Sequence, residues 1–91
     1  MDVATRHNPG AQRYEITVDG ELIGFADYRD LGKALEFPHT EIDRAWRGRG
    51  MGARLVGAAL ADVAASGTEV VPTCWYVAQY MREHPESVDA R

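Results

Sequence analysis

The sequence predicts an α+β domain of mixed α/β type, in which an antiparallel β-meander is followed by a β-α-β crossover and a C-terminal helix. Three observations predict it. Apolar and polar residues alternate in the first half of the chain, an apolar stripe at helical spacing starts near residue 50, and a short β-branched segment follows. The 91 residues, 45% hydrophobic and 26% charged, suit one domain over 1–91, with an ordered core expected at about 12–86.

The first half of the chain indicates three antiparallel strands. We expect Met1 to Ala11 to be a loose lead-in, because it is polar and contains Asn8-Pro9-Gly10. Asp19-Gly20 is a hairpin turn signal, and Asp30-Leu31-Gly32 indicates a second turn. The strands around these turns are expected at 14–18, 21–28 and 33–42. Pro38 lies inside the third strand and predicts an edge position or a bulge there.

The second half indicates a helix, a strand and another helix. The apolar stripe predicts a helix over 50–65, closed by Gly67 as a left-handed cap. Residues 68–73 are β-branched and short, which predicts a fourth strand. A second helix is expected over 75–83, ending before Pro85. Because a helix connects the third and fourth strands, we expect them to be parallel neighbours in a four-stranded sheet.

Composition narrows the class of function. The formal net charge of −4 argues against coating a nucleic acid. Cys74 is the single cysteine, so an internal disulfide and a cysteine-rich metal cluster are excluded. We see no apolar signal region and no run of membrane-spanning length, so we expect a cytoplasmic protein without a membrane partner.

The glycine-rich segment Arg47-Gly48-Arg49-Gly50-Met51-Gly52 stands at the expected start of the long helix. Main-chain N–H groups are unpaired at a helix start, and the helix dipole is positive there, so this segment predicts an anion site, above all for phosphate. A flexible turn with solvated arginines is the alternative. No Lys-Ser/Thr follows, so the segment is not a Walker A loop, and the third glycine of the dinucleotide fingerprint is missing.

The pattern Arg47-x-x-Gly50-x-Gly52 resembles the Gln/Arg-x-x-Gly-x-Gly/Ala signature of GNAT-type N-acetyltransferases, which grip the pyrophosphate of acetyl-CoA with it. The likeness is closest to small, single-domain GNAT-like proteins. They have similar segments to those at 36–42, 72–76 and 84–86, namely Glu-x-Pro-His-Thr-Glu-Ile, Pro-Thr-Cys-Trp-Tyr and His-Pro-Glu. The resemblance covers about residues 12 to 86.

This resemblance implies an acetyl-CoA-dependent N-acetyltransferase that acts on an unidentified amine of a small molecule or protein, by direct transfer or through a cysteine intermediate. The end of the third strand would contact the thioester and the pantetheine arm, and the glycine-rich segment would bind the pyrophosphate. The cofactor-binding residues implied are Glu41, Ile42, Asp43, Arg47, Gly48, Arg49, Gly50, Met51 and Gly52. Larger family members carry extra N-terminal elements, so we expect a shallow acceptor side, or one completed by another protein or a second subunit.

Three side chains are candidates for catalysis. Cys74 is expected near the thioester, where a thiolate could carry the acetyl group if a neighbouring base or helix start favoured it; burial in the core is the alternative. His39 suits a general base, with Glu41 on the same strand face to orient it; a hydrogen-bonded strand histidine and a solvated carboxylate are the alternatives. The resemblance offers Tyr80 as the acid for the leaving thiolate, although its spacing from Tyr76 also fits a packed helix face.

Two other functions remain open at this point. One is a non-catalytic module that binds CoA or acyl-CoA. The other is a small nucleotide- or nucleic-acid-binding domain, against which the acidic net charge counts. We expect a CoA ligand, an amine acceptor, no nucleic acid, and a monomer or weak homodimer. The spacing of the histidines, Glu41 and Cys74 does not indicate a metal site.

Overall fold

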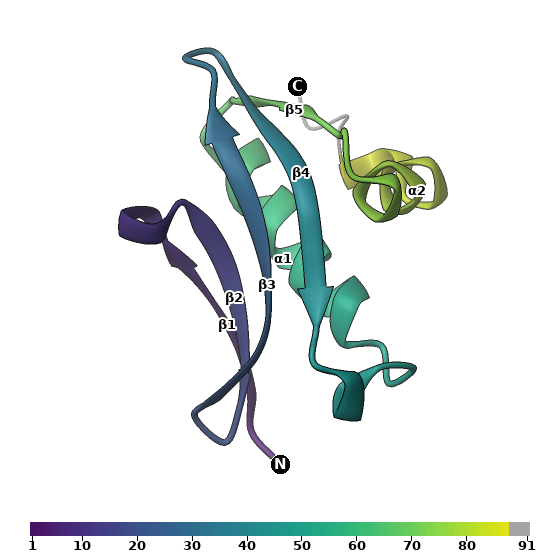
Figure 1. The fold of residues 1–91 in the computed structure, drawn as a ribbon. Helices are drawn as coiled ribbons and strands as arrows, with labels where there is room; N and C mark the ends of the chain where they lie inside the picture. Colours follow the sequence, from purple (N-terminus) through teal and green to yellow (C-terminus); the bar gives the residue numbers. More distant parts are fainter. Residues whose placement is uncertain (88–91) are drawn as a thin grey trace.

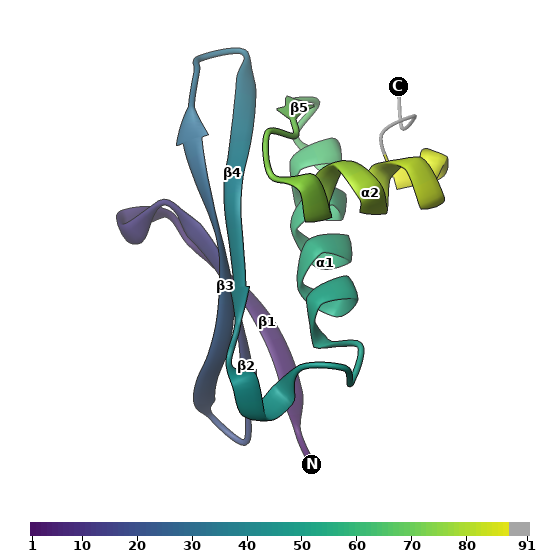
Figure 2. The ribbon, with the colours of Figure 1, turned by 45° about the vertical axis from the view of Figure 1, so that its right-hand side comes forward.

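In the computed structural model, which describes residues 1–87, five strands form one sheet and both α-helices lie on the same side of it (Figures 1 and 2). The strand order is β1-β2-β3-β4-β5, antiparallel from β1 to β4 and parallel between β4 and β5. The α+β class, the meander and the crossover are therefore confirmed. The elements are β1 (Val3–Asn8), β2 (Arg13–Val18), β3 (Glu21–Asp30), β4 (Ala34–Ile42), α1 (Met51–Ala65), β5 (Glu69–Val71) and α2 (Trp75–Glu83), with 3-10 turns at Pro9–Ala11, Arg44–Trp46 and Pro85–Ser87.

The N-terminal segment is a strand, so the prediction of a loose lead-in and a four-stranded sheet is wrong. β1 pairs with the whole of β2, from Val3 opposite Val18 to Asn8 opposite Arg13. Its four middle residues are exposed, and it therefore lacks the apolar alternation by which a strand is recognised. It is an edge strand, held mainly through its main chain.

The core lies between α1 and the covered face of the sheet. Six residues of α1 are buried, among them Leu55 and Leu60, and they pack against Ile16, Ala26 and Phe37 of the strands. The predicted cap is also confirmed. Gly67 has φ +73°, its N–H donates to the carbonyl of Ala64, and the N–H of Thr68 donates to that of Val63. This Schellman arrangement turns the chain back toward the sheet.

The pairing of β4 with both of its neighbours changes near Pro38. The pairs Asp27–His39 and Arg29–Glu36 leave two residues, Phe37 and Pro38, opposite one residue of β3, which is a bulge. β5 is shorter than expected and pairs only with residues 34–36 of β4, so within the described part of the chain no strand covers the far edge of β4 after Glu36. Pro38 therefore lies at both a bulge and an open edge, as the sequence predicted.

The uncovered face of the sheet carries a buried carboxylate. Glu15 is 1% exposed and accepts hydrogen bonds from Arg6 Nε at 2.6 Å, Arg13 Nε at 2.7 Å and Asn8 Nδ2 at 3.0 Å. Burial by itself would raise the pKa of Glu15, but these hydrogen bonds outweigh it and lower the pKa from 4.5 to about 2. Because Arg6 and Asn8 belong to β1, this carboxylate also fastens the edge strand.

This arrangement predicts an acid-sensitive contribution to stability. A carboxyl pKa that is lower in the folded state stabilises the protein above the unfolded value of 4.5, and the effect is lost as the pH falls toward 2. We expect Glu15→Gln to lower the free energy of unfolding by about 2 to 3 kcal/mol at pH 7 and by about half as much at pH 3. Urea denaturation at both pH values measures this. The exposed Glu21→Gln is the control, and an equal loss from Glu15→Gln at both pH values would contradict the assignment.

Candidate functional site

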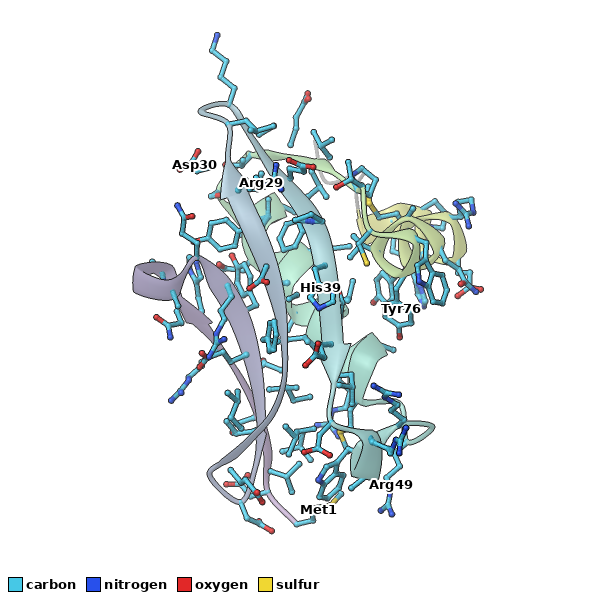
Figure 3. The ribbon with its side chains drawn as sticks, in the orientation of Figure 1. Met1, Arg29, Asp30, His39, Arg49 and Tyr76 are labelled. Atoms are coloured by element: carbon cyan, nitrogen blue, oxygen red, sulfur yellow. The ribbon has the colours of Figure 1, made fainter. Side chains whose placement is uncertain are left out.

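A cleft of about 710 Å³ opens where β5 diverges from β4. One wall is residues 38–42 of β4, and another is residues 73–76 at the start of α2. The segment between them contributes Trp46, Arg47, Gly48, Gly50, Met51 and Gly52. Figure 3 shows His39 on the β4 side and Tyr76 on the α2 side. Three separate parts of the sequence thus meet in one cavity.

The glycine-rich loop forms one end of this cleft. Gly48 and Gly50 have φ values of +76° and +79°, a left-handed conformation that suits glycine, and α1 begins directly after Gly50. No side chain caps the helix there, so the first N–H groups of α1 are left for another partner. An uncapped helix start of this kind suits an anion.

The two arginines of the loop lie in different surroundings. Arg47 lines the cleft, and its Nε donates to the carbonyl of Ile42 at 3.0 Å, which fastens the loop to the end of β4. Arg49 does not line the cleft; its guanidinium lies 5.1 Å from the ring centroid of Trp46. Trp46 packs on the core and also lines the cleft.

The open edge of β4 forms the long wall. The N–H of Asp43 donates to the carbonyl of Ile23 at 2.7 Å, and main-chain groups alternate along an antiparallel pair. The N–H and C=O groups of Thr40 and Ile42 therefore point away from β3, toward the cleft. Glu41 and Ile42 line the cleft as expected, whereas Asp43 does not, and its carboxylate accepts from the N–H of Ala45.

His39 and Glu41 share a strand face, as the sequence predicted. His39 Nε2 lies 3.2 Å from Glu41 Oε1, and both side chains line the cleft. They belong to the face of the sheet that no described helix covers, and each side chain is more than half exposed, at 54% and 56%. The imidazole of His39 is thus accessible to solvent and to a ligand that approaches from that face.

Cys74 lies on the opposite wall, at the N-cap of α2. It is 8% exposed, its N–H donates to the carbonyl of Phe37 at 2.8 Å, and its Sγ donates to Thr40 Oγ1 at 3.7 Å. The thiol of Cys74 therefore contacts the side chain of Thr40, a residue of β4 that also lines the cleft.

The tyrosine that faces the cleft is Tyr76, which the sequence indicated as a packing residue. A Cβ on Gly52 would lie only 2.8 Å from its hydroxyl, so glycine there makes room for Tyr76. Burial, followed by the charges of Glu83 and Tyr80, raises the pKa of Tyr76. The structure does not bring Tyr80 to the cleft; it packs over Gly57 and stacks on His84, with ring centroids 4.1 Å apart. Because Tyr76 and Tyr80 share one face of α2, the sequence does not indicate which of them contacts the glycine-rich loop.

Within residues 1–87, no group of three or more His, Cys, Asp or Glu side chains is placed to hold a metal ion. No helix in that range has the length and apolar character needed to cross a membrane.

The sequence matches a known family. Residues 13–90 match the model of the family described as GCN5-related N-acetyl-transferase. The chain is also similar to the protein NATD1 of Homo sapiens, with 39% identity over 59 residues, which are 64% of this chain and 52% of that protein. For NATD1 of Mus musculus the match is also 39% over 59 residues, or 54% of that protein, and for Danio rerio it is 29% over 91 residues, or 83% of that protein. The matched segment spans about half the length of the human and mouse relatives.

The contact between Gly52 and Tyr76 gives a test of this geometry. We expect Gly52→Ala to lower the free energy of unfolding by about 1 to 3 kcal/mol, because its methyl group meets the Tyr76 hydroxyl. Adding Tyr76→Phe should recover part of that loss, whereas adding Tyr80→Phe should recover none of it. Thermal denaturation of the single and double variants measures both effects. Equal recovery by the two phenylalanine variants would contradict the packing of Tyr76 on the loop.

Proposed function

This chain belongs to the family of GCN5-related N-acetyl-transferases, and we propose that it transfers the acetyl group of acetyl-CoA to an amine. One observation carries the proposal: the start of α1 and the open edge of β4 face the same cleft. An anion site and a row of main-chain hydrogen-bonding groups suit the two ends of a molecule that has a diphosphate and an amide-containing arm.

The residues of the cleft fit acetyl-CoA. The unpaired N–H groups at the start of α1, with the positive charge of Arg47, suit the diphosphate. The N–H and C=O of Thr40 and the N–H of Ile42 suit the amides of the pantetheine arm, as an added strand would, while the C=O of Ile42 accepts from Arg47 Nε. The bound cosubstrate supplies an acetyl group activated as a thioester, from which a C–N bond forms as the C–S bond breaks.

His39 is the proposed general base. An amine is protonated at neutral pH and must lose a proton before it can attack, and the imidazole lies at the rim of the cleft on the side open to an acceptor. Glu41, whose Oε1 lies 3.2 Å from Nε2, orients the ring.

Tyr76 is the proposed proton donor for the leaving sulfur, in place of Tyr80. Its hydroxyl lies over the glycine-rich loop in the cleft, and a phenol carries its proton at neutral pH. The described part of the chain places no second tyrosine in the cleft.

Direct transfer to the amine is the favoured route. A covalent route through Cys74 needs a base to take the thiol proton. The hydrogen-bond partner of Sγ is instead the hydroxyl of Thr40, and the thiol is almost fully buried. Cys74 then serves as a wall of the site, next to the open edge of β4.

CoA should raise the melting temperature, because a ligand that binds the folded state stabilises it. We expect Gly50→Val to abolish this increase, since a β-branched residue does not adopt a φ of +79° without displacing the loop. Gly32→Val is the matched control, because Gly32 also has a positive φ, of +95°, but lies in the turn between β3 and β4. A CoA shift that survives Gly50→Val would contradict the loop as the binding site.

Turnover separates the proposed roles. We expect His39→Asn to lower kcat by about 10² to 10⁴ while the Kd for CoA stays within about twofold, which is typical of a lost general base. Cys74→Ala should retain kcat within about threefold if transfer is direct. The readouts are CoA release with a panel of amines and the label bound to the protein after incubation with radiolabelled acetyl-CoA. Label that disappears in Cys74→Ala would establish the covalent route, and CoA binding without turnover on any amine would indicate a non-catalytic binding module.

A further inference from the structure

The cleft closes at its end farthest from the glycine-rich loop. There the N–H of Cys74 donates to the carbonyl of Phe37 at 2.8 Å, so the start of α2 and β4 are in main-chain contact. Thr73 Oγ1 donates to Glu36 Oε2 at 2.8 Å and to the same carbonyl at 3.5 Å. Pro38, Thr73 and Cys74 line the cleft next to this closure. We call this part of the cleft the closed end.

We propose that the closed end holds the acyl group of the donor and limits it to two carbon atoms, with Cys74 and Thr40 as the side chains that determine this specificity. The inference rests on the proposed acetyl transfer and names the class of acyl donor that the site accepts.

The direction of the pantetheine arm brings the acyl group to the closed end. The diphosphate is proposed at the start of α1, and the arm beside Ile42 and then Thr40. Along the same edge of β4, the ligand next reaches Pro38, two residues beyond Thr40. His39, the proposed base, lies between Pro38 and Thr40 in the strand. The thioester carbon that the amine attacks therefore lies beside these residues, with the acyl chain directed to the closed end.

Two side chains close this end of the cleft on the side of the helices. Cys74 Sγ lies 3.7 Å from Thr40 Oγ1, so the side chains of the two walls are in contact. The core lies behind them, because Cys74 is buried and belongs to the same apolar cluster as Phe37 and Leu55. Since a protein interior is close-packed, a further methylene group of the ligand has no space on that side.

The uncovered face of the sheet is the direction that stays open, and the acceptor needs it. The side chain of His39 is more than half exposed and belongs to that face (Figure 3). An amine that gives its proton to His39 therefore approaches from there. A longer acyl chain that turns toward the same face occupies the position of the amine. Propionyl-CoA and butyryl-CoA should accordingly bind to the protein but transfer their acyl groups slowly.

Acetyl-CoA, propionyl-CoA and butyryl-CoA test the proposal, with one amine as the acceptor throughout and CoA release as the readout. We expect kcat/KM for propionyl-CoA to be lower than that for acetyl-CoA by about tenfold or more, which is the discrimination that one methylene group gives, and that for butyryl-CoA to be lower still. The Kd values should agree within about threefold, because the added carbon atoms stay exposed to solvent. Equal kcat/KM values for the three donors would overturn the proposal.

Variants connect the preference to the two side chains. Cys74→Gly and Thr40→Ala each vacate space on the helix side, so kcat/KM for propionyl-CoA relative to acetyl-CoA should rise about fivefold in each. Thr40→Val is the control for size, because it loses the hydroxyl and keeps the bulk of the side chain. Val77→Ala is the control for lost core packing, since Val77 is also buried in α2 but does not line the cleft. Both controls should keep the ratio of the unaltered protein.

The two enlarging variants decide the outcome together, so the test stands if one of them fails to fold. A ratio that stays unchanged in Cys74→Gly and Thr40→Ala, or that rises equally in Val77→Ala, would overturn the proposal.

Failure of the proposed transfer is distinguishable from failure of this inference. If no donor acylates any amine, the transferase function is contradicted, and the closed end is then tested by binding alone. In Cys74→Gly the methyl group that propionyl-CoA adds is buried, so the ratio of the Kd for acetyl-CoA to that for propionyl-CoA should rise about threefold over the unaltered protein. Isothermal titration calorimetry measures both constants. An unchanged ratio in Cys74→Gly and in Thr40→Ala would overturn the closed end as the acyl site.

Discussion

The divergence of β5 from β4 is the constraint on which the site depends. Pro38 has no N–H to offer a neighbouring strand, and with Phe37 it forms a bulge opposite β3. β5 accordingly leaves β4 after Glu36, and the N–H of Cys74 pairs with the carbonyl of Phe37 as the chain turns into α2. The rest of β4 keeps an open edge, and that edge is the long wall of the cleft.

Two contacts hold the ends of this wall in place. Arg47 donates to the carbonyl of Ile42 and so connects the glycine-rich loop to the end of β4, which keeps the anion site in line with the open edge. Tyr76 packs over Gly52 and connects the start of α2 to the start of α1. The side chains proposed for catalysis lie between these contacts, with His39 on the uncovered face of the sheet and Cys74 across the cleft from it.

Much of this fold follows from local sequence patterns. The meander, the two helices, the Gly67 cap and the parallel pairing of β4 with β5 are set by short-range periodicity, turn residues and connection length. β1 was missed because an exposed edge strand has no apolar pattern, and Glu15 because its burial depends on side chains from β1. The choice between Tyr76 and Tyr80 depends on how α2 meets α1, which is a tertiary contact that no local pattern encodes.

The central claim is that one cleft holds the diphosphate at the start of α1 and the arm of the ligand along the open edge of β4. A crystal structure of the complex with CoA tests it most directly. The account predicts diphosphate oxygens within hydrogen-bond distance of the first main-chain N–H groups of α1, and pantetheine amides beside Thr40 and Ile42. CoA bound elsewhere, with those main-chain groups facing solvent, would contradict it.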